Sequence, residues 1–284
     1  MVPGLAFLAP FLAVMLLLQY LPLAVMARDS LYRFSLYNPS EAEFRGVRNY
    51  KEILSDPEVL QSFGVSLMFI VGVVALVLPV SFLIAVFLNG RVPGRAIVRT
   101  LVFLPVVTSQ VVVATMWTFM LGRQGLFNSV LGAVGIEPVS FLANKNLALL
   151  AIIIMTVWQQ VGLACVIFLG GLQRIPAEIE ESAALDGAGP WRRMWSIVMP
   201  LVSRTTVVIA VVITVFALQA FAPAYIMTGG APEGSTNLIV YHIYKTAFVL
   251  QDPGYASALS IVVLAFALVV SLAQAKILRA DWTY

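Results

Sequence analysis

The chain has 284 residues, a net charge of +3 and a mean hydropathy of +0.95; 61% of its residues are hydrophobic and only 11% are charged. A soluble domain carries roughly 25% charged residues, and a soluble fold could not keep this much apolar surface from water. The composition therefore excludes a soluble enzyme, a nucleic-acid-binding protein and a disordered protein, and the single Cys165 and single His242 argue against a disulfide scaffold or a Cys/His metal site.

Six runs of more than twenty residues contain no charged residue, and each is long enough to cross the bilayer core once as a helix. We therefore predict an all-α integral membrane protein that forms a single transmembrane domain over 1–284. The predicted spans are 3–27, 62–88, 100–121, 147–171, 205–226 and 255–277. The first run is interpreted as a span and not as a signal peptide, because it lacks a positively charged start and contains Pro3, Pro10 and Pro22.

The positive charges predict the orientation of these spans. Arginine and lysine gather in the 91–99 loop, in the 172–204 loop and after the last span, so we expect these three segments to be cytoplasmic. Both termini are then cytoplasmic, in a bacterial-type inner membrane. The 28–61 segment mixes both signs of charge and is predicted to be a small folded extracytoplasmic segment. It contains a short amphipathic helix over 49–56, with Tyr50, Ile53 and Leu54 facing inward.

The loop over 172–204 is patterned as two helices and a turn. Pro176 suits the first position of a helix, and Glu178, Glu180 and Glu181 suit its first turns. Gly187 and Gly189 can end that helix, and Pro190 opens a second one that runs toward Pro200. The large apolar residues of the loop could either pack against the ends of the spans or form a docking surface for a partner: Ile179, Leu185, Trp191, Met194 and Trp195.

This segment resembles the EAA loop of the permeases of ABC importers, a pattern of Glu-Ala-Ala, Asp-Gly-Ala and Ile-x-x-Pro. Seven positions match: Glu181, Ala183, Asp186, Gly187, Ala188, Ile197 and Pro200. The departures are Ser182, Met194 and Met199, none of which removes a charge or the turn glycine. The resemblance favours the docking interpretation. It implies a loop that contacts an ATPase through Glu181, Ser182, Ala183, Ala184, Asp186, Gly187, Ala188, Trp191 and Met194.

A second stretch, over 221–236, resembles the Phe-Asp-x-x-Tyr-x-Met-Thr-Gly-Gly-Gly-Pro pattern of sugar-type permeases, with Ala222 in place of the aspartate and Ala231 in place of a glycine. The resemblance covers most of the chain and is greatest to the first permease subunit of maltose and glycerol-phosphate importers. It implies the type I permease fold of ABC importers, with six transmembrane helices and a cytoplasmic coupling loop.

The resemblance also implies a function and a set of partners. The chain would be the permease of an ATP-driven importer for a sugar or related polyol, working by alternating access with a second permease subunit, two ATP-binding subunits and an extracytoplasmic solute-binding protein. It contains no Gly-x-x-x-x-Gly-Lys-Ser/Thr pattern, so we expect it to be non-catalytic and to bind no cofactor, with ATP and magnesium held by the partner ATPase. A glycerol-phosphate or glycerophosphodiester importer and a stand-alone secondary transporter remain as alternatives.

Polar and aromatic groups inside the spans are candidates for the substrate path, because they are costly in lipid and a sugar needs both apolar faces and hydrogen-bond donors. They equally suit contacts between helices or anchoring at the membrane interface. The candidates are Trp158, Gln159, Gln160, Gln219, Phe221 and Tyr225. Cys165 and His242 are expected to have structural roles.

Overall fold

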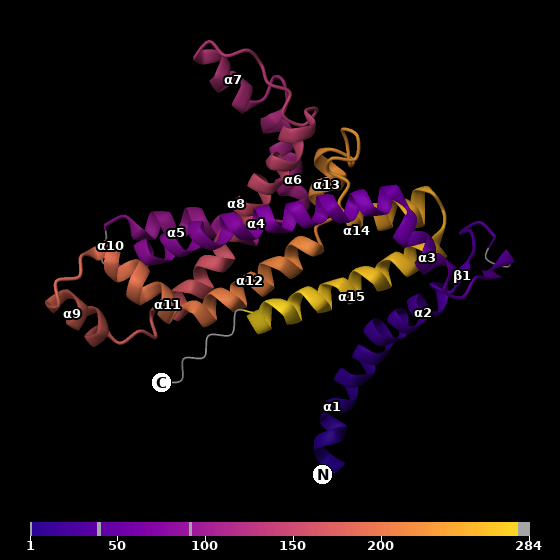
Figure 1. The fold of residues 1–284 in the computed structure, drawn as a ribbon, viewed down its shortest axis with the longest axis horizontal. Coiled ribbons are helices and arrows are strands. Elements are labelled where there is room, and N and C mark those ends of the chain that lie inside the picture. Colours follow the sequence, from indigo (N-terminus) through magenta and orange to yellow (C-terminus); the bar gives the residue numbers. More distant parts are fainter. Residues whose placement is uncertain (1, 39–40, 91–92, 278–284) are drawn as a thin grey trace. The chain divides into compact units, whose positions relative to one another are not determined.

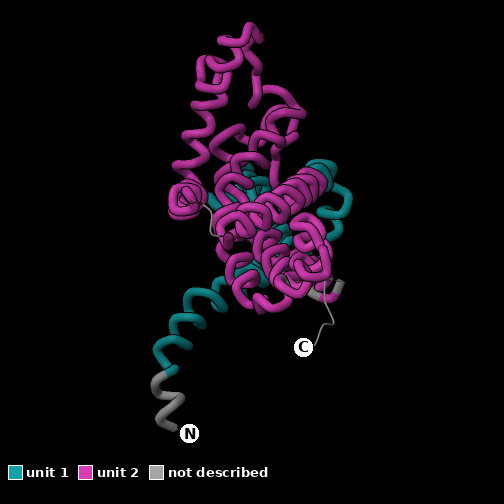
Figure 2. The backbone as a smooth tube through the Cα atoms, turned by 90° about the vertical axis from the view of Figure 1, so that its left-hand side faces the viewer, with its two compact units in different colours: residues 1–63, 239–266 teal, residues 64–238, 267–284 magenta. Residues whose placement is uncertain are grey.

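The computed structural model describes residues 2–38, 41–90 and 93–277, and these residues are mostly helical (Figure 1). The chain divides into two compact units, one formed by residues 1–63 and 239–266 and the other by residues 64–238 and 267–284 (Figure 2). Helices α4 (Pro57–Asn89) and α15 (Pro253–Ile277) each contribute to both units.

The first unit begins with a helical run formed by α1 (Val2–Met15), the π-helical segment η1 (Leu16–Tyr20) and α2 (Leu21–Asp29). Two antiparallel strands of two residues each follow, β1 (Tyr32–Arg33) and β2 (Glu43–Phe44). The short helix α3 (Arg48–Ser55) comes next. The later part of the chain adds α14 (Ile239–Tyr244), η5 (Lys245–Val249) and the first part of α15. In its described residues, the predicted folded segment over 28–61 therefore contains β1, β2 and α3, between the end of α2 and the start of α4.

The core of this unit is small, and α3 supplies part of it. Ile53 packs with Val59 of α4 and with Ala258 and Leu259 of α15, and Tyr50 lies against this cluster. The prediction that Leu54 also faces inward is wrong, because its side chain is 75% exposed. The inward position belongs to Asn49, one helical turn before Ile53. The side-chain amide of Asn49 donates to the carbonyl groups of Ser30 at 2.9 Å and Tyr32 at 3.0 Å.

The second unit is built around α8 (Lys145–Leu172), half of whose residues are buried. It contacts α5 (Arg95–Phe103), the 3₁₀ segment η3 (Leu104–Val107), α6 (Gln110–Leu121), α12 (Ser203–Leu218) and α13 (Ala222–Met227). The remaining elements are α7 (Leu126–Ala133) and the loop elements α9 (Ala177–Leu185), α10 (Pro190–Arg193), η4 (Met194–Val198) and α11 (Met199–Leu201).

Glycine lets α8 approach its neighbour closely. A Cβ atom on Gly162 would lie 2.4 Å from the carbonyl oxygen of Val102 and 2.4 Å from Cγ2 of Val106. Since atoms cannot overlap to that extent, only glycine permits this crossing of α8 with α5 and η3.

Two of the predicted spans are not single straight helices. The run over 100–121 bends by 107° between Arg95–Val107 and Gln110–Ala133, with Thr108 extended and Ser109 non-helical at the break. The run over 205–226 ends as a helix at Leu218 and resumes at Ala222. The ring of Pro223 is incompatible with a helical carbonyl at Gln219, four residues earlier, which accounts for the second break.

Among the residues that the structure describes, four helices are long and apolar enough to cross a membrane: Leu8–Asp29, Pro57–Asn89, Lys145–Leu172 and Pro253–Gln274. The number rises to six if each of two bent pairs counts as one span, the second pair being Pro190–Leu201 with Ser203–Leu218 at 69°. Helices α4, α8 and α15 contain the runs predicted over 62–88, 147–171 and 255–277. The mostly helical, multi-pass architecture predicted from composition is confirmed.

Candidate functional site

The candidate site that the sequence singled out most strongly, the 172–204 loop, contains the two helices and the turn predicted for it. Its first helix, α9, begins at Ala177. Pro176 stands one position earlier than predicted, as the extended N-cap residue with φ −60° and ψ 136°. The difference is one residue and leaves Glu178 in the first turn, where the helix dipole favours an anion.

Gly187 ends α9 in a Schellman motif. Its φ is +77°, its N–H donates to the carbonyl of Ala184 at 3.1 Å, and the N–H of Ala188 donates to the carbonyl of Ala183 at 3.0 Å. These two bonds satisfy carbonyl groups that would otherwise end the helix without partners. The turn glycine predicted from sequence therefore has a definite structural role, which is to set the direction in which the chain leaves α9.

The second half of the loop is attached to the long helices by aromatic contacts. Pro190 occupies the start of α10 as predicted, and the helical path continues through η4 and α11. The ring of Trp195 in η4 lies 6.2 Å from that of Phe82 in α4, and Phe82 lies 5.5 Å from Phe168 in α8. Ring contacts therefore connect this half of the loop to α4, and α4 to α8.

The outer surface of the loop is open. Leu185 is 89% exposed and Trp191 69% exposed, and the predicted docking residues Glu181, Ser182, Ala184, Asp186 and Gly187 are exposed as well. By contrast, Ala183 is buried, whereas Ala188 and Met194 are half-buried. Trp195 thus packs against a long helix through its contact with Phe82, as one interpretation expects, whereas Leu185 and Trp191 are exposed. Their use as a docking surface stays a prediction.

Arg193 is a residue of the loop that the sequence analysis missed. It lines a hollow of about 370 Å³ together with Glu181 of α9 and Asn89 at the end of α4. Its Nε atom is buried, and no acceptor among the described residues reaches it. The sequence shows Arg193 only as a basic residue in the second loop helix. That pattern does not distinguish it from any other positive charge in a cytoplasmic loop.

The predicted path residues on α8 have different environments. Gln159 is buried, and its amide nitrogen donates to the carbonyl of Thr108 at 3.1 Å, where the helix over 100–121 is broken. Gln160 is half-buried, and Trp158 is 40% exposed with its ring 6.1 Å from that of Trp117. Gln159 therefore supports an unwound backbone segment, a role that the sequence offered only in general terms as contact between helices.

We predict that Gln159→Leu lowers the free energy of unfolding by about 1–2 kcal/mol, because the part-buried Thr108 carbonyl loses its donor. The measurement is thermal unfolding of the purified protein in detergent, with Gln160→Leu as the matched control on the next position of the helix. Equal unfolding temperatures for wild type and Gln159→Leu would show that the bond at the break contributes nothing to stability.

The remaining path candidates lie around the second break. The rings of Phe221 and Tyr225 are stacked, with centroids 5.2 Å apart and planes 16° apart, and Tyr225 is 48% exposed. Gln219 is exposed at the end of α12. Because α13 packs against both α6 and α8, the segments that carry the two groups of candidates are neighbours. Their assignment to a substrate path stays a prediction.

His242 lies in the short helix α14, between the runs predicted as spans over 205–226 and 255–277, and it lines a cavity of about 730 Å³ in the first unit. Ion pairs surround this cavity, between Arg33 and Asp252 at 2.9 Å and between Lys245 and Glu58 at 3.6 Å. Burial is the main cause that lowers the pKa of His242. The carboxylates of Glu58 and Asp56 act in the opposite direction and raise this pKa, whereas the positive charge of Lys245 lowers it further. The buried imidazole is therefore held in its neutral form at neutral pH.

This shift predicts a pH dependence of stability. The pKa in the unfolded chain is about 6.5 and is lower in the folded protein, so the unfolded state binds the proton more readily. The stability that the neutral His242 contributes is complete above the unfolded pKa of about 6.5 and is lost as the pH falls from there toward the folded pKa. We expect the difference in melting temperature between wild type and His242→Gln to shrink between roughly pH 8 and roughly pH 5.5. A difference that does not change with pH would contradict this origin.

Comparison with known proteins decides the family. A family model described as binding-protein-dependent transport system inner membrane component matches residues 77–280. This chain belongs to that family. It is 35% identical over 272 residues to the trehalose/maltose transport system permease protein MalF of Thermococcus litoralis, covering 94% of this chain and 90% of that protein. It is 33% identical over 280 residues to the probable ABC transporter permease protein YurN of Bacillus subtilis, covering 96% of this chain and 94% of that protein.

Other relatives widen the range of named substrates. The sn-glycerol-3-phosphate transport system permease protein UgpA of Rhizobium meliloti is 34% identical over 226 residues, which cover 78% of this chain and 76% of that protein. Among solved structures, a chain of a bacterial alginate ABC transporter in complex with its alginate-bound periplasmic protein superposes with a TM-score of 0.83 at 22% identity, covering 96% and 93%. That likeness establishes the fold. The resemblance to ABC importer permeases noted in the sequence is thereby confirmed.

Proposed function

We propose that this member of the family is the permease subunit of an ATP-driven importer for a sugar or related polyol. The observation that carries this proposal is the exposed α9–Gly187–α10 loop, which has the EAA pattern and is attached through Trp195 to the long helices. The sugar class is supported by the trehalose/maltose permease of Thermococcus litoralis, which aligns over almost the whole chain.

The loop offers a physical route for energy to enter the chain. The sequence has no phosphate-binding Walker pattern, so ATP and its magnesium would be held by two separate ATP-binding subunits. Helix α9, with Leu185 exposed at its end and Trp191 exposed in α10, would seat in a groove of one of them. When the ATPase closes, the rigid loop moves with it, and the Trp195–Phe82 contact carries the displacement into α4. Two packings of the helices then alternate access to the two sides.

Further partners follow from the exposed apolar surface and from the family. Leu17 and Leu18 in η1 are 62% and 75% exposed, and the described part of the helical run from α1 to α2 has no buried residue in its apolar stretch. Such a surface needs lipid or another membrane helix, and a second permease subunit would supply the latter. A solute-binding protein would deliver substrate from the extracytoplasmic side, and the chain itself would catalyse no reaction. Both termini would be cytoplasmic.

A glycerol-phosphate importer is the second candidate, and its support is the 34% identity to the permease protein UgpA of Rhizobium meliloti. The predicted path residues speak for a neutral solute, because they include amides and aromatic rings but no lysine or arginine. A phosphate would then depend on groups supplied by the other permease subunit. A stand-alone secondary transporter is disfavoured because the family is dependent on a binding protein.

The test of this function is uptake by the reconstituted complex. The chain would be expressed with the permease, ATPase and binding-protein genes beside its own, purified as an assembly and placed in liposomes. The purified binding protein would then be screened against sugars, polyols and glycerol phosphate, and each ligand found would be offered for uptake. We expect import of a sugar or polyol that requires both ATP and binding protein. Failure of any ATPase to co-purify would overturn the proposal.

A further inference from the structure

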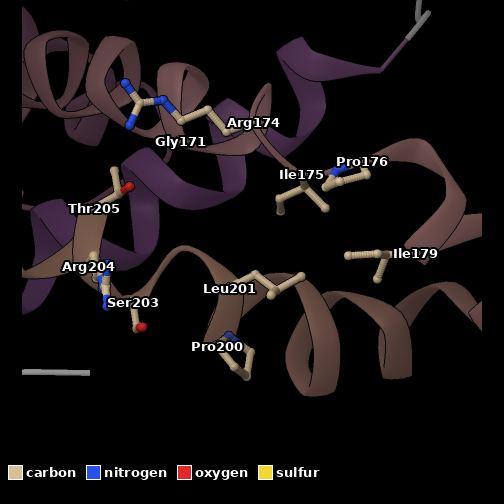
Figure 3. A pocket seen from close by; sticks show the side chains of 10 residues that line it. All are labelled: Gly171, Arg174, Ile175, Pro176, Ile179, Pro200, Leu201, Ser203, Arg204 and Thr205. Atoms are coloured by element: carbon tan, nitrogen blue, oxygen red, sulfur yellow. The ribbon is translucent and has the colours of Figure 1, made fainter. Parts of the chain in front are cut away.

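A cavity of about 500 Å³ lies between the C-terminal end of α8, the start of α9 and the junction of α11 with α12 (Figure 3). Its lining is divided by chemistry. Arg174, Ser203, Arg204 and Thr205 supply the polar groups at one end of the view, whereas Ile175, Ile179 and Leu201 supply the apolar part at the other. A molecule that fits this cavity needs a polar end and an apolar end.

The polar end is built on a close crossing of two helices. A Cβ atom on Gly171 would lie 2.5 Å from Oγ1 of Thr205, so glycine allows α8 and α12 to meet at that point. Arg174 follows Gly171 by three residues, and Arg204 precedes Thr205 directly. The crossing therefore fixes the backbone positions from which the two arginines reach the cavity.

The charged side chains that the structure describes in this lining are basic. Its described residues supply two guanidinium groups and two hydroxyl donors, with no aspartate or glutamate among them. Within the part of the chain that the structure describes, no carboxylate forms an ion pair with Arg174. Because guanidinium groups bind phosphate oxygens in pairs of parallel hydrogen bonds, a phosphate is the anion that this arrangement suits best.

The position of the cavity along the helices identifies the source of such a phosphate. Arg174 lies two residues beyond the end of α8, and Arg204 is the second residue of α12, so both flank long apolar helices. That is the level at which an apolar helix leaves the hydrocarbon and phospholipid headgroups begin. Basic pockets between transmembrane helices on the cytoplasmic side suit acidic headgroups, and the apolar part of the lining suits the adjoining glycerol and acyl chain.

We propose that this cavity binds the phosphate headgroup of an anionic phospholipid, held by Arg174 and Arg204 with the Ser203 and Thr205 hydroxyls. Because α9 begins at the rim of the same cavity, bound lipid would brace the base of the EAA loop against α8 and α12. The site is separate from the outer face of α9 and concerns a different ligand from the transported solute.

The test is native mass spectrometry of the intact transporter assembly, released from mixed phosphatidylglycerol and phosphatidylcholine and compared with Arg174→Gln/Arg204→Gln. We expect the double variant to retain roughly tenfold less phosphatidylglycerol. Arg174→Lys/Arg204→Lys keeps both positive charges and should retain most of the bound phosphatidylglycerol. This variant therefore separates a loss of lipid binding from a loss of folding. Arg123→Gln changes an exposed arginine outside the cavity lining and should behave as wild type.

A second arm separates the two sources of phosphate. Inorganic phosphate in excess, at constant ionic strength, should leave the retained phosphatidylglycerol unchanged, because it cannot occupy the apolar part of the cavity. Displacement of the lipid by inorganic phosphate would overturn the lipid assignment in favour of a free phosphate site. Equal lipid retention by wild type and the glutamine double variant would overturn the site altogether.

Discussion

Replacing Gly187 with valine is expected to reduce ATP-driven uptake by roughly tenfold or more while leaving the amount of folded protein in the membrane unchanged. Gly187 has a φ of +77°, a conformation that costs a β-branched residue at least about 1–2 kcal/mol. The chain would relieve this strain by giving up the Schellman bonds, so the exit direction from α9 would change. Uptake into proteoliposomes and substrate-stimulated ATP hydrolysis measure the effect.

Gly187→Asn is the matched control, because asparagine tolerates left-handed conformations far better than valine. No described atom lies within 4 Å of the position of a Cβ on Gly187, so the Cβ of either side chain enters open space and the comparison reports mainly on backbone strain. We expect the asparagine variant to keep most of the uptake. If valine were tolerated as well as asparagine, the geometry of this turn would not be what couples ATP hydrolysis to transport.

Replacing Gly162 with alanine is expected to destabilise the second unit by about 1–3 kcal/mol, the range typical of an overpacked interior. The added methyl group would meet the Val102 carbonyl oxygen at 2.4 Å, and a backbone atom cannot move aside as a flexible side chain can. The separation of α8 from α5 and η3 would also weaken the bond from Gln159 to Thr108. Thermal unfolding in detergent and the yield of folded protein report this change.

Gly170→Ala on the same helix provides the control. No atom lies within 4 Å of a Cβ at Gly170, so this substitution adds a methyl group to open space and improves helix propensity. We expect it to unfold at or above the temperature of the wild type. The packing explanation fails if Gly162→Ala and Gly170→Ala give the same unfolding temperature.

The long apolar helices could be predicted from sequence because the absence of charge over twenty or more residues leaves few alternatives. This is why α4, α8 and α15 contain the predicted runs. The two breaks could not be predicted in the same way. Thr108 and Ser109 do not lower the hydropathy of the run enough to mark a break. The break depends on Gln159, 51 residues after Thr108, whose side-chain amide donates to the Thr108 carbonyl.

The loop was more predictable because its signals are local. A proline at a helix start and a glycine just past a helix end each describe the backbone within a few residues, and both lie within one residue of their predicted positions. The contacts that join the loop to the rest of the unit are not local. Phe82 meets Trp195 across 113 residues, and Arg193 and Asn89 line the same hollow only because of the fold. Nothing in the order of residues marks either pair.

Cross-linking from α9 tests most directly whether ATP hydrolysis by a separate subunit enters this chain through its EAA loop. Ser182→Cys places a thiol on the exposed surface of α9, whereas the native Cys165 is buried; Ser129→Cys on α7 is the exposed control. In membranes containing the whole transporter, a short thiol-reactive cross-linker should join the Ser182→Cys variant to the ATPase subunit and should not join the Ser129→Cys variant. Absence of that product, or equal products from both positions, would contradict the account.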